Sequence, residues 1–135
     1  MTKQKILLLI PLTIVTGLLV YSWATILFTD VVATWRHYLA LALFIGLIYL
    51  FFKSFKKTVL ATGIYLIFGT CNLLTLTPSV TTNSYGMRIG SLELWTPTFQ
   101  LLSFSILVLF FVLNFDTLIN IRLDYQEARQ AKKKK

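Results

Sequence analysis

Five polar side chains stand inside or beside long apolar stretches, and their types are those of a small binding site. They are Arg36, His37, Asn72, Gln100 and Ser103. A guanidinium group can bind an anionic or carbonyl group, and amide side chains can orient that group by hydrogen bonds. Because buried polar groups in lipid are costly unless satisfied, these residues should face inward and mark either helix contacts or a site.

Two interpretations of this outer polar pocket are open. In the first, Asn72 and Gln100 hydrogen-bond across helices as structural contacts worth about 0.6 to 2 kcal/mol each. Arg36 and His37 then reach out to lipid phosphate. In the second, Arg36 binds an anionic or carbonyl ligand that the two amides orient. His37 either titrates in that pocket or serves as an interfacial aromatic.

A second polar group lies at the opposite end of the apolar stretches. Asp116 falls near the end of the last stretch, on the same side as Lys53, Lys56 and Lys57. A carboxylate at this depth is either protonated or paired with a cation. We expect an interfacial ion pair between Asp116 and these lysines, with proton coupling as the alternative.

Residues 87–94 alternate in polarity around Gly90-Ser91, a pair that suits a two-residue turn. In that register Arg88 faces Glu93, so that opposite charges meet on one face of the pair. The pattern predicts a short β-hairpin, with an irregular loop as the alternative. The apolar face of such a hairpin must cover either the outer mouth of the helices or a partner.

Apolar segments have to position these residues. The chain has 135 residues, of which 56% are hydrophobic and 13% charged, too little polar surface for a soluble globule of this size. The fold class predicted is therefore all-α, an integral membrane four-helix bundle forming one domain over 1–135. Its spans are expected over 6–28, 31–52, 58–76 and 99–120. The first span would measure about 35 Å, enough to cross about 30 Å of hydrocarbon.

Basic residues set the expected topology. Of 13 Lys and Arg residues, all except Arg36 and Arg88 fall on one side of the four spans. Such an excess is typical of the cytoplasmic side, so we expect both termini inside (N-in/C-in) and the hairpin loop between the third and fourth spans to be extracytoplasmic. The cytoplasmic basic tail, 121–135, should bind anionic lipid headgroups.

Location and partners follow from the same charges. The chain is expected in the cell (cytoplasmic) membrane as a multi-pass protein, or in the endoplasmic reticulum membrane of a eukaryote. Its net charge of +8 does not indicate nucleic acid, because the basic residues flank apolar runs and do not line a solvated face.

The motifs of most enzyme classes are missing from the sequence. Cys71 is the single cysteine, so there is no thiol pair for redox exchange. Metal-ligand spacing and glycine-rich phosphate loops do not occur. We therefore expect no enzyme activity, no cofactor and no metal.

The function expected is association, as an accessory or assembly subunit of a larger membrane complex, with a protein partner or a homo-oligomer. The alternative is an oligomeric small-molecule or ion transporter or channel, since several copies could enclose a pathway that four short helices cannot. An enzyme acting on lipid comes third. One predicted face of the last span is apolar in its middle, which disfavours a hydrated pore through a single bundle. That face comprises Gln100, Ser103, Leu107, Phe110, Asn114 and Thr117.

Overall fold

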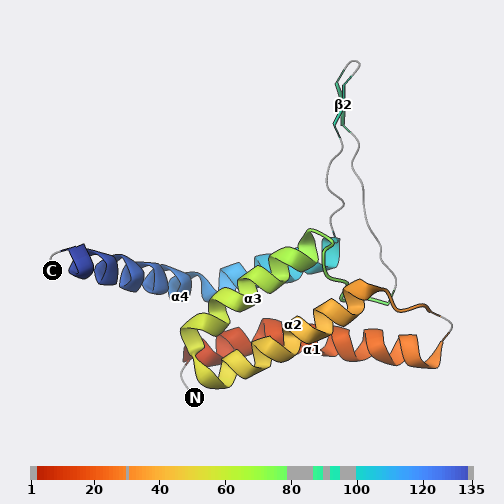
Figure 1. Cartoon of the computed structure of the whole chain (residues 1–135), viewed down its shortest axis with the longest axis horizontal. Helices are drawn as coiled ribbons and strands as arrows, with labels where there is room; N and C mark the ends of the chain where they lie inside the picture. Colours follow the sequence, from red (N-terminus) through yellow and green to blue (C-terminus); the bar gives the residue numbers. More distant parts are fainter. Residues whose placement is uncertain (1–2, 30, 79–86, 90–91, 95–99, 134–135) are drawn as a thin grey trace.

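The computed structural model describes residues 3–29, 31–78, 87–89, 92–94 and 100–133. Within these ranges the chain forms four α-helices (Figure 1), which are α1 (Lys3–Phe28), α2 (Trp35–Lys53), α3 (Phe55–Thr70) and α4 (Leu101–Lys133). The predicted all-α fold class is confirmed. By length and composition, α1, α2 and α4 are apolar enough to cross a membrane.

The first two helices match the predicted spans with small shifts. α1 covers the expected apolar stretch and one further turn that carries Lys3 and Lys5. α2 begins at Trp35, later than predicted, because the preceding residue, Thr34, has an extended backbone and is the N-cap. The Thr34 backbone carbonyl accepts a hydrogen bond of 3.0 Å from the His37 backbone amide. Only Ser54 separates α2 from α3, so the chain reverses direction at a sharp corner between these two helices (Figure 1).

The third helix is shorter than predicted. A span was expected over 58–76, but α3 has 16 residues and is about 24 Å long, less than the hydrocarbon layer of about 30 Å. The helix ends because Asn72 takes a positive φ of 59°. The Asn72 amide donates to the Gly69 carbonyl at 3.1 Å, and the Leu73 amide donates to the Phe68 carbonyl at 2.9 Å. These two bonds form a Schellman motif, a common helix terminus.

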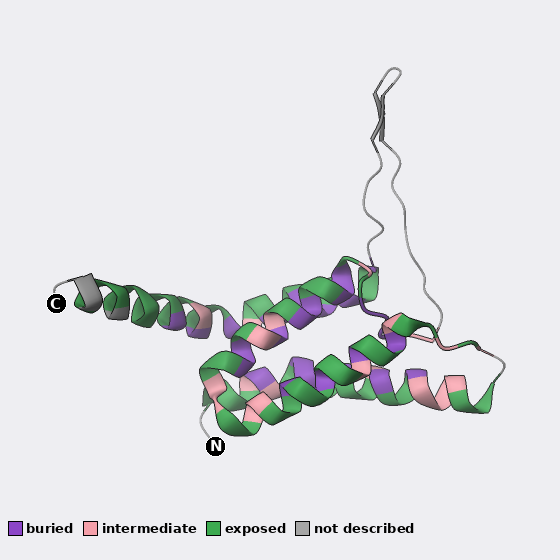
Figure 2. Ribbon diagram, in the orientation of Figure 1, coloured by how far each residue is buried: buried purple, intermediate pink, exposed green. Residues whose placement is uncertain are grey.

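α3 is the central helix, packing against α2, α4 and α1, while α1 also packs against α4. Its glycines allow α4 to come close. A Cβ on Gly63 would lie 3.3 Å from the Phe110 ring, and one on Gly69 would lie 3.3 Å from Ser103 Oγ. Buried residues follow the facing sides of the helices, and exposed residues cover the outside (Figure 2). Close approach at small residues is typical of helix packing in membranes.

The face predicted for the fourth span is confirmed, because all six of its residues are buried. They are Gln100, Ser103, Leu107, Phe110, Asn114 and Thr117. The other side of α4 exposes large apolar side chains, such as Val112, which is 71% exposed, and Phe115, which is 59% exposed. An exterior of this kind is suited to lipid tails or to an apolar partner.

α4 extends well beyond the length of a single span. Its 33 residues measure about 50 Å, whereas about 20 residues cross a bilayer. The last buried residue is Ile121, and the residues beyond it whose side chains are described are exposed. The predicted tail therefore continues as helix as far as Lys133.

Two three-residue strands, β1 (Met87–Ile89) and β2 (Leu92–Leu94), pair antiparallel with Arg88 opposite Glu93. The turn between them and both connections to the helices lie outside the described residues, as do the side chains of the strands. The fold class therefore rests on the helices alone. The extracytoplasmic hairpin, with any contact it makes, stays a prediction.

Candidate functional site

Part of the chain that follows α3 is buried although it is not helical. We call residues 71–78 the unwound segment. Leu74, Thr75 and Leu76 are all 0% exposed, and none of them belongs to a helix or strand. Irregular backbone at membrane depth persists only where protein surrounds it and its polar groups are satisfied. The residues that hydrogen-bond this segment are therefore the ones that position it.

Gln100 is the first of these residues and lies just before α4, 5% exposed. Its side-chain amide donates to Asn72 Oδ1 at 2.9 Å and to the Leu74 carbonyl at 3.1 Å. Ser103 Oγ donates to Gln100 Oε1 at 3.0 Å, which fixes the orientation of the amide. The Gln100 backbone amide also donates to the Thr70 carbonyl at 3.2 Å. This one residue ties α4 to the end of α3 and to the unwound segment.

His37 holds the other end of the unwound segment and is 2% exposed. Its Nδ1 accepts the Thr34 backbone amide at 3.1 Å and lies 2.9 Å from Thr34 Oγ1. Since an accepting Nδ1 carries no proton, the hydrogen sits on Nε2 and is donated to the Thr77 carbonyl at 3.2 Å. His37 therefore links the start of α2 to the unwound segment.

The predicted outer pocket is thus brought together in part. Asn72, Gln100 and Ser103 form one hydrogen-bonded cluster, and His37 binds the same segment a few residues along. Arg36 does not join them. It is half-buried, and its guanidinium stacks on the neighbouring Trp35 ring, 5.7 Å from the centroid. Since these hydrogen bonds are made to the chain itself, the geometry favours structural contacts of Asn72 and Gln100 over a ligand pocket. The expectation that His37 reaches out to lipid phosphate is wrong, because His37 is 2% exposed and its ring contacts Thr34 and Thr77.

Sequence reasoning missed the partners that complete this cluster. Thr34 and Thr77 were not singled out, nor was the helix end at Asn72. The sequence nevertheless contains a signal for the start of α2 and another for the end of α3. Thr34 precedes His37 by three residues, the spacing of a capping pair, and asparagine is a residue that can replace glycine at a left-handed helix terminus.

Some buried polar atoms have no partner within the described residues. Thr75 Oγ1 is one, inside the unwound segment, and Asn114 Oδ1 is another, although Asn114 Nδ2 donates to the Phe110 carbonyl at 3.1 Å. Ser22 Oγ and Trp23 Nε1 on α1 are also buried without a hydrogen-bond partner among the described residues. The Trp23 ring meets the Tyr38 ring edge-on at 5.2 Å, so the C-terminal part of α1 adjoins the N-terminal part of α2.

At the opposite end of the molecule, the ion pair involves a different carboxylate from the one predicted. Lys56 pairs with Asp124 on α4, eight residues and about 12 Å beyond Asp116 along the helix. Asp116 is exposed and joins no ion pair among the described residues. Lys53 lies over its own neighbour Tyr49, and Lys57 is exposed. The pairing differs because α4 stays helical past its span and carries Asp124 to the α2–α3 corner.

The remaining candidates are Arg88 and Glu93, which are opposite each other in the strand register, with side chains outside the described residues. No group of His, Cys, Asp or Glu side chains that could hold a metal occurs within the described ranges. Comparisons with protein families, curated proteins and solved structures found no match for this chain. The interpretation of the site therefore depends on its own geometry.

Proposed function

We propose that the chain is a small multi-pass membrane protein that acts by association, as an accessory or assembly subunit of a larger membrane complex. Three of its helices are suited to a bilayer. The polar groups expected to form a ligand pocket are instead hydrogen-bonded to the chain's own backbone at Leu74 and Thr77. A molecule built in this way offers surfaces to a partner more readily than a site to a substrate.

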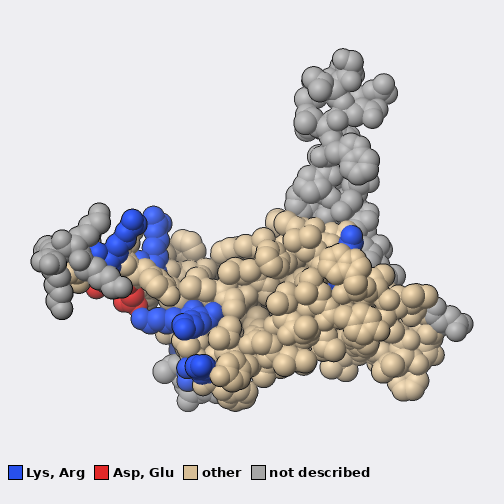
Figure 3. Space-filling model, in the orientation of Figure 1, with Lys and Arg blue, Asp and Glu red and all other residues tan. Residues whose placement is uncertain are grey.

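The proposed topology has both termini in the cytoplasm, in the cell membrane or, in a eukaryote, the endoplasmic reticulum membrane. Lys and Arg side chains gather at one end of the molecule, near the N-terminus, the α2–α3 corner and the extended end of α4 (Figure 3). α3 makes the third of four crossings together with the unwound segment, which supplies the depth that the short helix lacks. The strand pair then lies outside the cell and is available to a partner.

The observation that carries this proposal is the far end of α4. We call residues 122–133 the α4 arm. It extends about 18 Å past Ile121, and Asp124 ties it to Lys56 at the corner of α2 and α3. Leu123 and Tyr125 are 50% and 59% exposed on it, and each directly follows a charged residue, Arg122 and Asp124 respectively. Because residues two apart point to opposite sides of a helix, they mark two separate apolar positions on the arm, and a partner can contact either side. Exposed apolar side chains on a helix that has left the membrane are typical of a contact surface for another protein.

Transport is the competing function and has weaker support. A conduction path needs polar groups at every depth, whereas the buried face of α4 between Ser103 and Asn114 consists of Ile106, Leu107 and Phe110. A hydrated pathway through one copy is disfavoured on this ground. A pathway between copies would require a symmetric oligomer, which the same experiment detects.

The test is copurification of the tagged full chain from its native membrane in mild detergent. We expect a foreign subunit in constant stoichiometry, lost when Leu123 and Tyr125 are both changed to serine. The matched control changes Gln126 and Gln130 on the same arm to serine and should retain the subunit. A lone symmetric oligomer, or equal recovery of the subunit with both double variants, would overturn the role given to the arm.

A further inference from the structure

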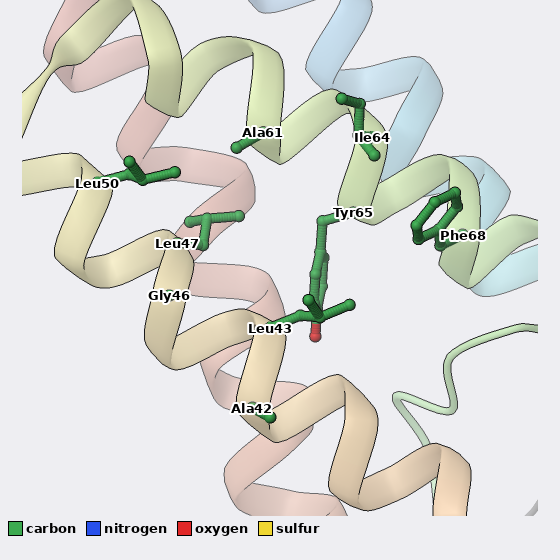
Figure 4. Close-up of a pocket in the computed structure, with 9 residues that line it drawn as sticks. All are labelled: Ala42, Leu43, Gly46, Leu47, Leu50, Ala61, Ile64, Tyr65 and Phe68. Carbon is green, nitrogen blue, oxygen red and sulfur yellow. The ribbon is translucent and has the colours of Figure 1, made fainter.

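A groove of about 300 Å³ runs between α2 and α3. Figure 4 shows its walls, which are apolar except for the hydroxyl of Tyr65, and that hydroxyl donates to the Ala40 carbonyl at 3.2 Å. The α2 wall carries Ala42, Gly46 and Leu50, and the α3 wall carries Ala61, Ile64 and Phe68. Among the described residues, no atom lies within 4 Å of the place where a Gly46 Cβ would stand. Gly46 therefore leaves this space open and does not serve the packing of the described helices against one another.

Lysines lie above the end of the groove where α2 meets α3. Lys57 is four, seven and eleven residues before Ala61, Ile64 and Phe68, so it shares their helix face. Lys53 is three and seven residues after Leu50 and Gly46 and likewise continues the opposite wall.

Neither Lys53 nor Lys57 is in an ion pair among the described residues. Lys53 donates to the Tyr49 hydroxyl at 3.4 Å, a neutral partner. The third lysine of this corner, Lys56, is paired with Asp124. Within the described part of the chain, two positive charges therefore remain uncompensated at the mouth of an apolar groove.

We propose that this groove binds one acyl chain of an anionic phospholipid, with the phosphate held by Lys53 and Lys57. The groove residues from Leu50 to Ala42 extend about 12 Å along α2, close to the depth of one leaflet, which is about 15 Å. The walls accept only an apolar occupant, and the lysines at its mouth select a negative headgroup at that depth.

A second copy of the chain fits this groove less well. Copies inserted in the same orientation would bring their own basic helix ends, such as Lys3 and Lys5 or Lys53, to the same depth. Like charges would then meet at a corner that already holds two uncompensated lysines. A lipid phosphate is negatively charged, so it would attract Lys53 and Lys57, whereas a second copy would repel them.

The test is native mass spectrometry of the full chain in detergent. Dioleoylphosphatidylglycerol or dioleoylphosphatidylcholine is added to the sample before the detergent is removed in the spectrometer. One phosphatidylglycerol adduct should bind about 30-fold more tightly than phosphatidylcholine, since each lysine contributes about 1 kcal/mol. The double change of Lys53 and Lys57 to alanine should remove that preference. Gly46→Leu, which fills the groove, should weaken binding about tenfold.

Gly17→Leu on α1 is the matched control. Gly17 likewise has no atom of the described residues within 4 Å of the place where its Cβ would stand, but it does not line this groove. The Gly17→Leu variant should bind phosphatidylglycerol as tightly as the native chain does. Both leucine variants should keep the helical circular dichroism of the native chain. Equal affinity for the two lipids, equal effects of the two leucine variants, or a dimer that Gly46→Leu dissociates would each overturn the proposal.

Discussion

Replacing Gln100 by leucine should release the unwound segment from α4. The native side chain donates to Asn72 Oδ1 at 2.9 Å and to the Leu74 carbonyl at 3.1 Å. Leucine preserves the approximate volume but can donate to neither acceptor. Ser103, which donates to Gln100 Oε1 at 3.0 Å, loses its partner as well.

The expected loss of stability is about 2 to 3 kcal/mol. Hydrogen bonds between membrane segments contribute about 0.6 to 2 kcal/mol each, and Gln100 makes two to this segment. The Leu74 carbonyl would in addition be left buried without its side-chain donor, since Leu74 is 0% exposed and an unsatisfied buried group costs about 1 to 3 kcal/mol. These contributions overlap, so they do not simply add.

Two measurements check this prediction. Unfolding of the purified chain in mixed micelles of increasing dodecyl sulfate content, followed by helical circular dichroism, should show the lower stability. Hydrogen exchange at the Leu73 and Leu74 amides, both bonded to the Phe68 carbonyl, should accelerate about 30- to 150-fold, the equivalent of the same free energy.

Ser105→Ala is the control for Gln100→Leu. Ser105 is a polar residue of α4, the helix that Gln100 directly precedes, and its hydroxyl donates to the Leu101 carbonyl on the exposed side. Its loss should therefore change stability by less than about 0.5 kcal/mol. If Gln100→Leu were as mild as Ser105→Ala, the cluster would not hold the unwound segment and the account of the site would be refuted.

Three further predictions concern helix contacts and the corner. Gly69→Val should destabilise the chain by about 1 to 3 kcal/mol in the same unfolding assay, because its Cβ would stand 3.3 Å from Ser103 Oγ; a native-like Gly69→Val would contradict the close approach of α3 and α4. Asn72→Ala should cost about 1 to 2 kcal/mol, since alanine is disfavoured at a φ of 59°, whereas Asn72→Gly should recover the backbone part of that loss. Asp124→Ala should cost under about 1 kcal/mol, and less at high salt, because the Lys56–Asp124 pair is exposed; a larger loss would mean that the α4 arm depends on this pair.

The sequence was sufficient to predict the helices and the buried face of α4. Uncharged stretches fix where helices can lie in lipid, and the spacing from Gln100 to Thr117 fixes which side turns inward. The polar cluster was predicted only as a set of residues at similar depth. Whether it would bind a ligand or the chain itself depended on the backbone, which spacing does not specify.

The third span was wrong in extent because apolar composition alone was used to define it. Residues 71–76 are as apolar as a helix in lipid requires, yet Asn72 ends α3, and residues 74–76 are buried without belonging to a helix. The ion pair was assigned to the wrong carboxylate for a related reason. Asp116 was predicted because it lies near the end of the last apolar stretch, on the same side as the lysines, whereas the continued helix brings Asp124 to Lys56.

The most direct test of the membrane account is labelling of single-cysteine variants in intact cells with a maleimide that does not cross membranes, in a Cys71→Ser background. Arg88→Cys should react before the cells are opened, whereas Ser54→Cys at the α2–α3 corner and Gln130→Cys on the α4 arm should react only afterwards. Labelling of Ser54→Cys or Gln130→Cys from outside, or protection of Arg88→Cys, would contradict the proposed crossings.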